Sequence, residues 1–80
     1  MNSHINQIVY DILRAANFDS VVLVTDQTVK KYCKLFNVSR ETLQAIAFAA
    51  CARIERDVPI HWEVASRACR ALATLAKYED

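Results

Sequence analysis

The sequence predicts an all-α protein, a compact bundle of four helices. The 80 residues contain no glycine and a single proline, Pro59. Glycine provides most of the positive φ angles that tight hairpin turns need, so a hairpin-rich β fold is unfavourable. Apolar residues instead recur every three or four positions, which is typical of amphipathic helices. We expect one domain, 1–80, with helices at residues 4–16, 26–36, 40–56 and 59–77.

The first predicted helix begins after Ser3, because serine often caps helix N-termini. Its apolar face has helical spacing and comprises Ile5, Ile8, Val9, Ile12, Leu13 and Ala16. A short extended linker is expected at 20–24, where β-branched residues dominate the segment Val21–Val24. An isolated strand is rarely stable, so the alternative for this segment is pairing with its copy in a second chain.

A short turn separates the second and third predicted helices. Thr25 or Asp26 is expected to cap the second helix. Its inner face consists of Val29, Tyr32, Cys33 and Phe36, and its outer face carries Lys30, Lys31 and Lys34. Asn37 should end this helix, since asparagine tolerates the left-handed conformation common at helix C-termini. Ser39 should cap the third helix.

The third predicted helix is apolar on almost every side. Its inner face is Leu43, Ile46, Ala47, Ala50 and Ile54, yet residues 45–52 contain no polar side chain at all. A helix that is apolar all round is normally buried, and an 80-residue chain offers few neighbours to cover every face. Phe48 projects away from the inner face, and small alanines around it allow another helix to approach. We expect a central helix with an outer face against a second subunit, formed by Ala45, Phe48, Ala49 and Ala52.

The fourth predicted helix begins at Pro59, because proline suits a first helical turn. Its inward face is expected to be Val64, Ala65, Ala68, Leu72 and Leu75. Its outward face is expected to be Glu63, Ser66, Arg67, Arg70, Thr74 and Lys77.

The segment Val29–Ile46 resembles the helix-turn-helix of DNA-binding proteins. In that family a small residue lies four places before a turn glycine, whose place an asparagine takes here, and a hydrophobic residue and a helix cap follow. Those positions are held here by Cys33, Asn37, Val38 and Ser39, and the buried positions of the second helix by Leu43 and Ile46. The resemblance implies base contacts from Ser39, Arg40 and Gln44, and phosphate contacts from Lys30, Lys31 and Lys34. A structural αα-corner uses similar residues and is the alternative.

Composition argues against several classes of partner. Ten Lys and Arg against nine Asp and Glu give a formal charge of +1, which is no electrostatic footprint of a dedicated nucleic-acid binder. No apolar run approaches the roughly 20 residues that span a bilayer, so no membrane partner is expected. The N-terminus lacks the basic region of a secretory signal. Three cysteines without close pairs do not form a disulfide framework, so we expect a cytoplasmic protein.

No residue pattern indicates a reaction centre. The cysteines and histidines lack the close pairs that zinc sites use, so no metal site is expected. A cysteine nucleophile would need a base within hydrogen-bond reach, and no motif supplies one. Without glycine there is no phosphate-binding loop. We therefore expect no catalytic residues, no cofactor and no small-molecule ligand. The expected function is protein–protein interaction, first as a homodimer, and DNA binding through residues 29–46 is the alternative.

Overall fold

The computed structural model describes residues 2–17, 24–57 and 62–77. These residues form four helices and no strand: α1 (Asn2–Asn17), α2 (Asp26–Phe36), α3 (Arg40–Asp57) and α4 (Trp62–Lys77). The predicted all-α fold with four helices is therefore confirmed. The extended linker expected at 20–24 lies outside the described residues, except for Val24, which is not in a strand.

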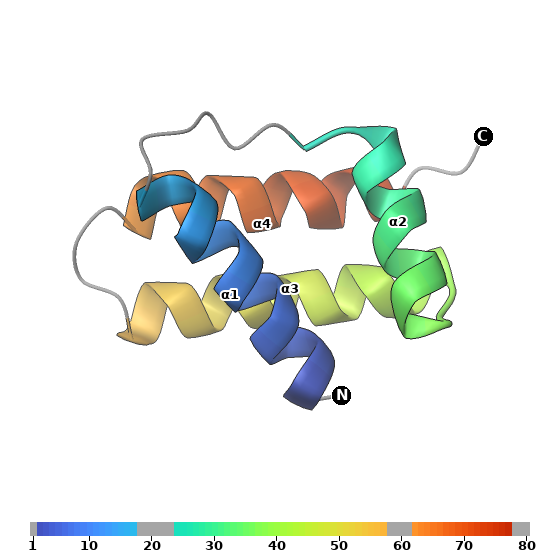
Figure 1. Ribbon diagram of the computed structural model, residues 1–80, viewed down its shortest axis with the longest axis horizontal. Coiled ribbons are helices and arrows are strands. Elements are labelled where there is room, and N and C mark those ends of the chain that lie inside the picture. The colour runs from blue at the N-terminus through green and yellow to red at the C-terminus, as the bar shows by residue number, and fades with distance from the viewer. Residues whose placement is uncertain (1, 18–23, 58–61, 78–80) are drawn as a thin grey trace.

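The helices α3 and α4 form the centre of the molecule. They run antiparallel and side by side, and they contact each other more extensively than any other pair (Figure 1). The helix α1 crosses this pair, and α2 lies across the end where α3 begins and α4 ends. Both outer helices therefore pack on the same central pair.

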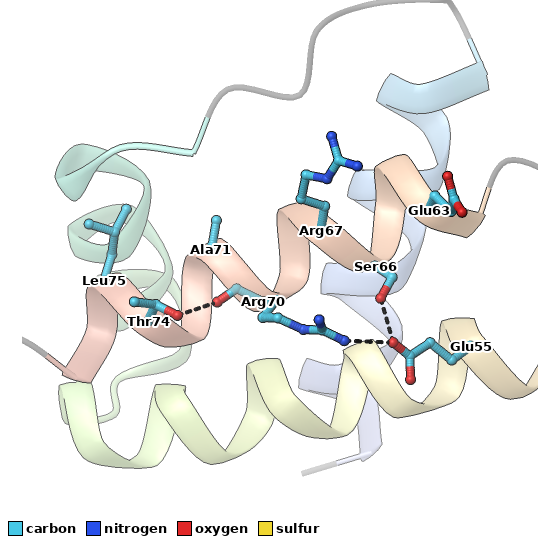
Figure 2. A pocket seen from close by; sticks show the side chains of 8 residues that line it. All are labelled: Glu55, Glu63, Ser66, Arg67, Arg70, Ala71, Thr74 and Leu75. Atoms are coloured by element: carbon cyan, nitrogen blue, oxygen red, sulfur yellow. Dashed lines mark hydrogen bonds and ion pairs between the residues drawn. The ribbon is translucent and has the colours of Figure 1, made fainter.

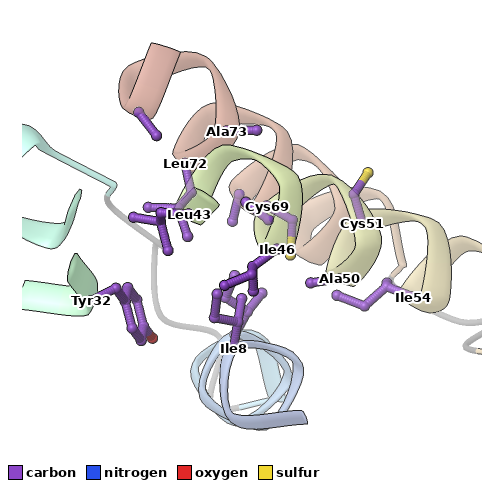
Figure 3. Packing of buried hydrophobic residues seen from close by; sticks show 14 of the residues in the cluster. Ile8, Tyr32, Leu43, Ile46, Ala50, Cys51, Ile54, Cys69, Leu72 and Ala73 are labelled. Carbon is purple, nitrogen blue, oxygen red and sulfur yellow. The ribbon is translucent and has the colours of Figure 1, made fainter. Parts of the chain in front are cut away.

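The core lies where α1 and α2 meet the central pair (Figure 3). Its largest fully buried side chains are Ile8, Val29, Leu43, Ile46, Ile54, Cys69 and Leu72. Six alanines of the central pair are also buried, namely Ala47, Ala50, Ala65, Ala68, Ala73 and Ala76. Small side chains at a helix contact allow a short interaxial distance, which explains the extensive contact between α3 and α4.

Local sequence signals determine where α2 begins and ends and where α3 begins. Thr25 is the N-cap of α2, and its backbone N–H donates to the Thr28 hydroxyl at 3.2 Å. Asn37 ends the helix in the left-handed conformation, with φ 55° and ψ 52°. The Ser39 hydroxyl accepts a hydrogen bond from the Thr42 backbone N–H at 3.2 Å and caps α3. The roles predicted for Thr25, Asn37 and Ser39 are confirmed.

Side chains also connect the two outer helices. The Tyr32 hydroxyl of α2 donates to an Asp11 carboxylate oxygen of α1 at 2.7 Å. Burial, and then the hydrogen bond to this carboxylate, raises the pKa of Tyr32, so the phenol stays protonated. The His4 ring of α1 stacks on the Phe36 ring of α2 at a centroid distance of 4.2 Å. These contacts link α1 to α2 from its first turn, at His4, to beyond its midpoint, at Asp11.

Three predictions about helix ends and faces were wrong. Ser3 is not a cap, because α1 already begins at Asn2 and Ser3 lies in its first turn. Val64 is 47% exposed rather than inward, and Ser66 is only 3% exposed rather than outward. The buried arc of α4 is centred on Cys69 and Ala76, and Val64 lies about 140° away from Cys69 around the helix. Ser66 lies on the side facing α3, where it finds polar partners.

Candidate protein interface

The outer face of α3 carries the four residues that the sequence predicted as an interface. Phe48 is 49% exposed, Ala45 and Ala52 are exposed, and Ala49 is half-buried. The five predicted inner residues of α3 (Leu43, Ile46, Ala47, Ala50 and Ile54) are all fully buried on the opposite side. The helix therefore has two apolar faces, and the described part of the chain covers only one of them.

Helical geometry explains why the Phe48 side chain is exposed to solvent. It lies two residues beyond Ile46, which rotates it by about 200° around the helix, away from the core. A phenylalanine buries about 200 Å² when fully covered, so covering the exposed half of Phe48 would contribute roughly 2 kcal/mol. Its apolar neighbours Ala45 and Ala52 add to the same surface and present no long side chain that would keep a partner away.

Charged residues border this apolar face at both ends. Glu41 lies in the first turn of α3 and Arg56 in its last turn. Both are exposed, and with Ala45, Phe48 and Ala52 they follow one another at intervals of three or four residues. We refer to these five residues as the outer stripe of α3. The two charged members were not among the residues predicted from the sequence, although their spacing from the alanines is the signal that places them on the same face.

Arg56 already has a partner of opposite charge within its own chain. Its Nε lies 2.8 Å from one carboxylate oxygen of Asp57, and a second guanidinium nitrogen lies 3.1 Å from the other. The side chains are 72% and 51% exposed, so water and salt screen the pair and it adds little to stability. Arg56 is therefore able to exchange this partner for another carboxylate.

Among the residues that the structure describes, three other large apolar side chains are exposed, each on a different helix. Tyr10 is 54% exposed, Leu35 60% and Val64 47%. Single exposed apolar side chains are ordinary on soluble proteins, and only a contiguous patch suggests an interaction site. Phe48 differs from them because exposed alanines precede and follow it on the same helical face.

A polar cluster connects α3 to α4 beside this face (Figure 2). The Ser66 hydroxyl donates to Oε1 of Glu55 at 2.7 Å, and an Arg70 guanidinium nitrogen donates to the same oxygen at 2.9 Å. The Cys51 Sγ lies 3.2 Å from the Ser66 hydroxyl oxygen. The hydrogen bond from Ser66, and then those from Cys51 and Arg70, lower the pKa of Glu55. A carboxylate stabilised in this way is a weak proton acceptor, so the cluster is better suited to holding the helices together than to acid–base chemistry.

A hollow of about 580 Å³ lies along α4 next to this cluster. Charged side chains of both signs line it, including Glu63, Arg67 and Arg70, together with Ala71 and Leu75. Figure 2 shows Arg70 directed toward Glu55, whereas Arg67 points to the other side of α4. The charged groups thus do not converge on one point. In the described ranges, no group of three His, Cys, Asp or Glu side chains could hold a metal ion.

The predicted DNA-contacting residues lie at the corner between α2 and α3, and several are engaged within the chain. Lys30, Lys31 and Lys34 are exposed, although Lys30 pairs with Asp26 at 3.3 Å. Arg40 donates to the Leu75 carbonyl at 2.7 Å and to Asp26 at 3.2 Å, and its side chain is only 19% exposed. The Ser39 hydroxyl is used in capping α3, and Gln44 is half-buried.

Comparison with known proteins adds no relationship. No family model matches the chain, and no curated protein and no solved structure matches it significantly. Among the described helices, none has the length and hydrophobicity needed to cross a membrane.

Proposed function

We propose that this protein acts by protein–protein interaction rather than by catalysis, and that its first partner is a second copy of itself. The observation that carries the proposal is the exposed apolar face of α3, in which Phe48 is flanked by Ala45, Ala49 and Ala52. Apolar surface in contact with water is thermodynamically unfavourable, so a partner that covers this face would be bound by the hydrophobic effect. The three free cysteines, two of them buried, fit a reducing compartment such as the cytoplasm.

The dimensions of this face predict a weak, reversible contact. The helix α3 has 18 residues and is therefore about 27 Å long, and the face is one helix wide. Stable complexes bury about 800 Å² on each partner, and smaller interfaces are typical of transient association. We expect a monomer–dimer equilibrium with a Kd in the micromolar range or weaker, so that monomer and dimer exchange at working concentrations.

The first prediction concerns Phe48. We expect Phe48→Ala to weaken the dimer by about 2 kcal/mol, or roughly thirtyfold in Kd, because truncation removes the largest apolar group of the contact. Sedimentation equilibrium from about 10 μM to about 1 mM measures this change directly. Leu35→Ala is the matched control, since Leu35 is also a large exposed side chain but lies on α2. It should leave the Kd unchanged.

Two results would contradict the proposal. One is a wild-type protein that remains monomeric throughout this concentration range. The other is a Phe48→Ala variant that unfolds at a lower temperature but keeps the wild-type Kd, because Phe48 would then stabilise its own chain. The buried inner face of α3 does not involve Phe48, so we expect the unfolding temperature of the diluted monomer to change little.

DNA binding by residues 29–46 is supported less well, because Arg40 and Ser39 are engaged in contacts that hold the helices in place. A fluorescence titration against random duplex at low salt distinguishes the two functions. Non-specific binding of a helix-turn-helix protein has a Kd of about 100 μM or below and weakens steeply with salt. Such binding, combined with a monomeric protein, would favour the DNA-binding function over self-association.

A further inference from the structure

We propose that two copies of the chain pair their α3 helices antiparallel, about a twofold axis that passes between Phe48 and Ala49. This inference rests on the proposed self-association and adds the orientation of the partner. It follows from the order of residues in the outer stripe of α3, which runs Glu41, Ala45, Phe48, Ala52, Arg56.

The outer stripe is complementary to itself when one copy is reversed. A twofold axis brings together residues that lie equally far from it in opposite directions along the helix. Ala45 and Ala52 are equally far from the midpoint between Phe48 and Ala49, so Ala45 faces the partner's Ala52. Glu41 and Arg56 are also equally far from it, so Glu41 faces the partner's Arg56. Each dimer therefore contains both pairs twice.

The charges select the antiparallel direction. In a parallel pair, Glu41 would lie beside the partner's Glu41 and Arg56 beside the partner's Arg56, and like charges repel. The antiparallel pair places opposite charges together at both ends and also aligns the helix dipoles favourably. The exposed Arg56–Asp57 ion pair is weak enough for Arg56 to turn toward the partner's Glu41.

The apolar part of the stripe fits the same arrangement. The spacing of three and four residues between Ala45, Phe48 and Ala52 is the spacing of a coiled-coil seam. Alanine pairs on both sides of the axis allow the two helices to approach closely, so that each Phe48 ring is covered by the other α3. All five residues of the stripe are already exposed in the monomer, so association needs no rearrangement of the fold.

Cysteine cross-linking tests the orientation on the full chain. Two variants, Ala45→Cys and Ala52→Cys, are prepared in a Cys33→Ala background, while Cys51 and Cys69 are buried and remain. Mixing the two variants under mild oxidation should give a disulfide-linked dimer that contains one chain of each. Either variant alone should give almost none, because residue 45 and its copy would be about 10 Å apart along the axis, beyond the reach of a disulfide.

The outcomes separate the orientation from the proposed function. Cross-linking of each variant with itself, but not with the other, means parallel helices, which overturns the orientation and leaves self-association standing. A Phe48-dependent dimer that gives no cross-link in any combination also overturns the orientation. A wild-type monomer, or a dimer that is insensitive to Phe48→Ala, overturns both.

Charge reversal provides an independent measurement. Glu41→Lys and Arg56→Glu should each raise the Kd severalfold, because each creates two like-charge contacts per dimer. The double variant restores opposite charges across the axis and should return the Kd close to that of the wild type. In a parallel dimer neither single change would weaken association, since like charges already face each other there. Lys34→Glu on α2 is the control and should leave the Kd unchanged.

Discussion

Asn37 shows how a single residue shapes this chain. It is the one residue with a positive φ in the described part of the chain. Its N–H donates to the Lys34 carbonyl at 3.3 Å, and the N–H of Val38 donates to the Cys33 carbonyl at 3.1 Å. These bonds satisfy the last carbonyl groups of α2 and turn the chain toward α3. Because the sequence has no glycine, asparagine supplies the left-handed conformation that glycine often provides.

Glycine and alanine at position 37 are predicted to affect stability differently. Asn37→Gly should leave the free energy of unfolding unchanged or raise it slightly, because glycine adopts a positive φ without strain. Asn37→Ala should lower it by about 1 kcal/mol, which corresponds to roughly 4–8 °C in Tm for a domain of this size. Thermal unfolding followed by circular dichroism measures both changes. Lys34→Gly is the control, because glycine inside a helix should destabilise by up to about 1 kcal/mol.

At the scale of the helices, Arg40 joins elements that are distant in sequence. It lies in the first turn of α3 and donates to the carbonyl of Leu75, in the last turn of α4, at 2.7 Å. It also reaches Asp26, in the first turn of α2, at 3.2 Å. One planar guanidinium therefore holds the beginning of two helices and the end of a third. This role explains why an arginine suited to reading DNA bases is partly buried instead.

Replacing Arg40 is predicted to loosen the end of the molecule where these three helices meet. Arg40→Met keeps the aliphatic stem but removes both hydrogen-bonded contacts, and we expect a loss of about 2 kcal/mol in the free energy of unfolding. Arg40→Lys should lose less, because a single ammonium group can hold one partner but not both. Urea denaturation measures the loss. Arg67→Met, at an exposed position of α4, should change stability by less than about 0.5 kcal/mol. Equal stability of the Arg40→Met and Arg67→Met variants would refute the role of Arg40.

At the scale of the whole molecule, carboxylates with lowered pKa values make the stability of the fold depend on pH. Hydrogen bonds from Lys30 and then Arg40 lower the pKa of Asp26, and the hydrogen bond from Ser66, followed by those from Cys51 and Arg70, lowers that of Glu55. A carboxyl group whose pKa is lower in the folded state stabilises the fold above its unfolded pKa. That contribution disappears as the pH falls through the lowered value.

We therefore predict a Tm that is constant from pH 7 to about pH 5 and decreases below about pH 4. Glu55→Gln should have a lower Tm at pH 7 and a shallower decrease in acid, because one of the titrating groups has been removed. Calorimetry measures the Tm, and a low protein concentration ensures that the monomer is the species that unfolds. A wild-type Tm that is unchanged at pH 3 would show that these carboxylates do not stabilise the fold. Glu63→Gln, at an exposed position of α4, is the matched control.

Much of this fold could be predicted because its signals are local. Caps such as Thr25, Asn37 and Ser39 act through hydrogen bonds within one helical turn, so residue type and position were sufficient to identify them. The two faces of α3 were likewise predictable, since spacing alone separates Phe48 from Ile46. The outer stripe lies on one such face, and for that reason its three apolar members, Ala45, Phe48 and Ala52, could be named from the sequence.

Tertiary structure decided which part of each helix surface meets another helix. Val64 and Ser66 were assigned to the wrong sides because apolar spacing gives a face but not the angle at which α4 lies against α3. Ser66 is buried because its hydroxyl donates to Glu55 of α3 and also lies within hydrogen-bond distance of the Cys51 thiol. The contact of Arg40 with Leu75 joins residues 35 positions apart. No local pattern contains such contacts, because they form between helices that are distant in sequence and meet only when the chain has packed.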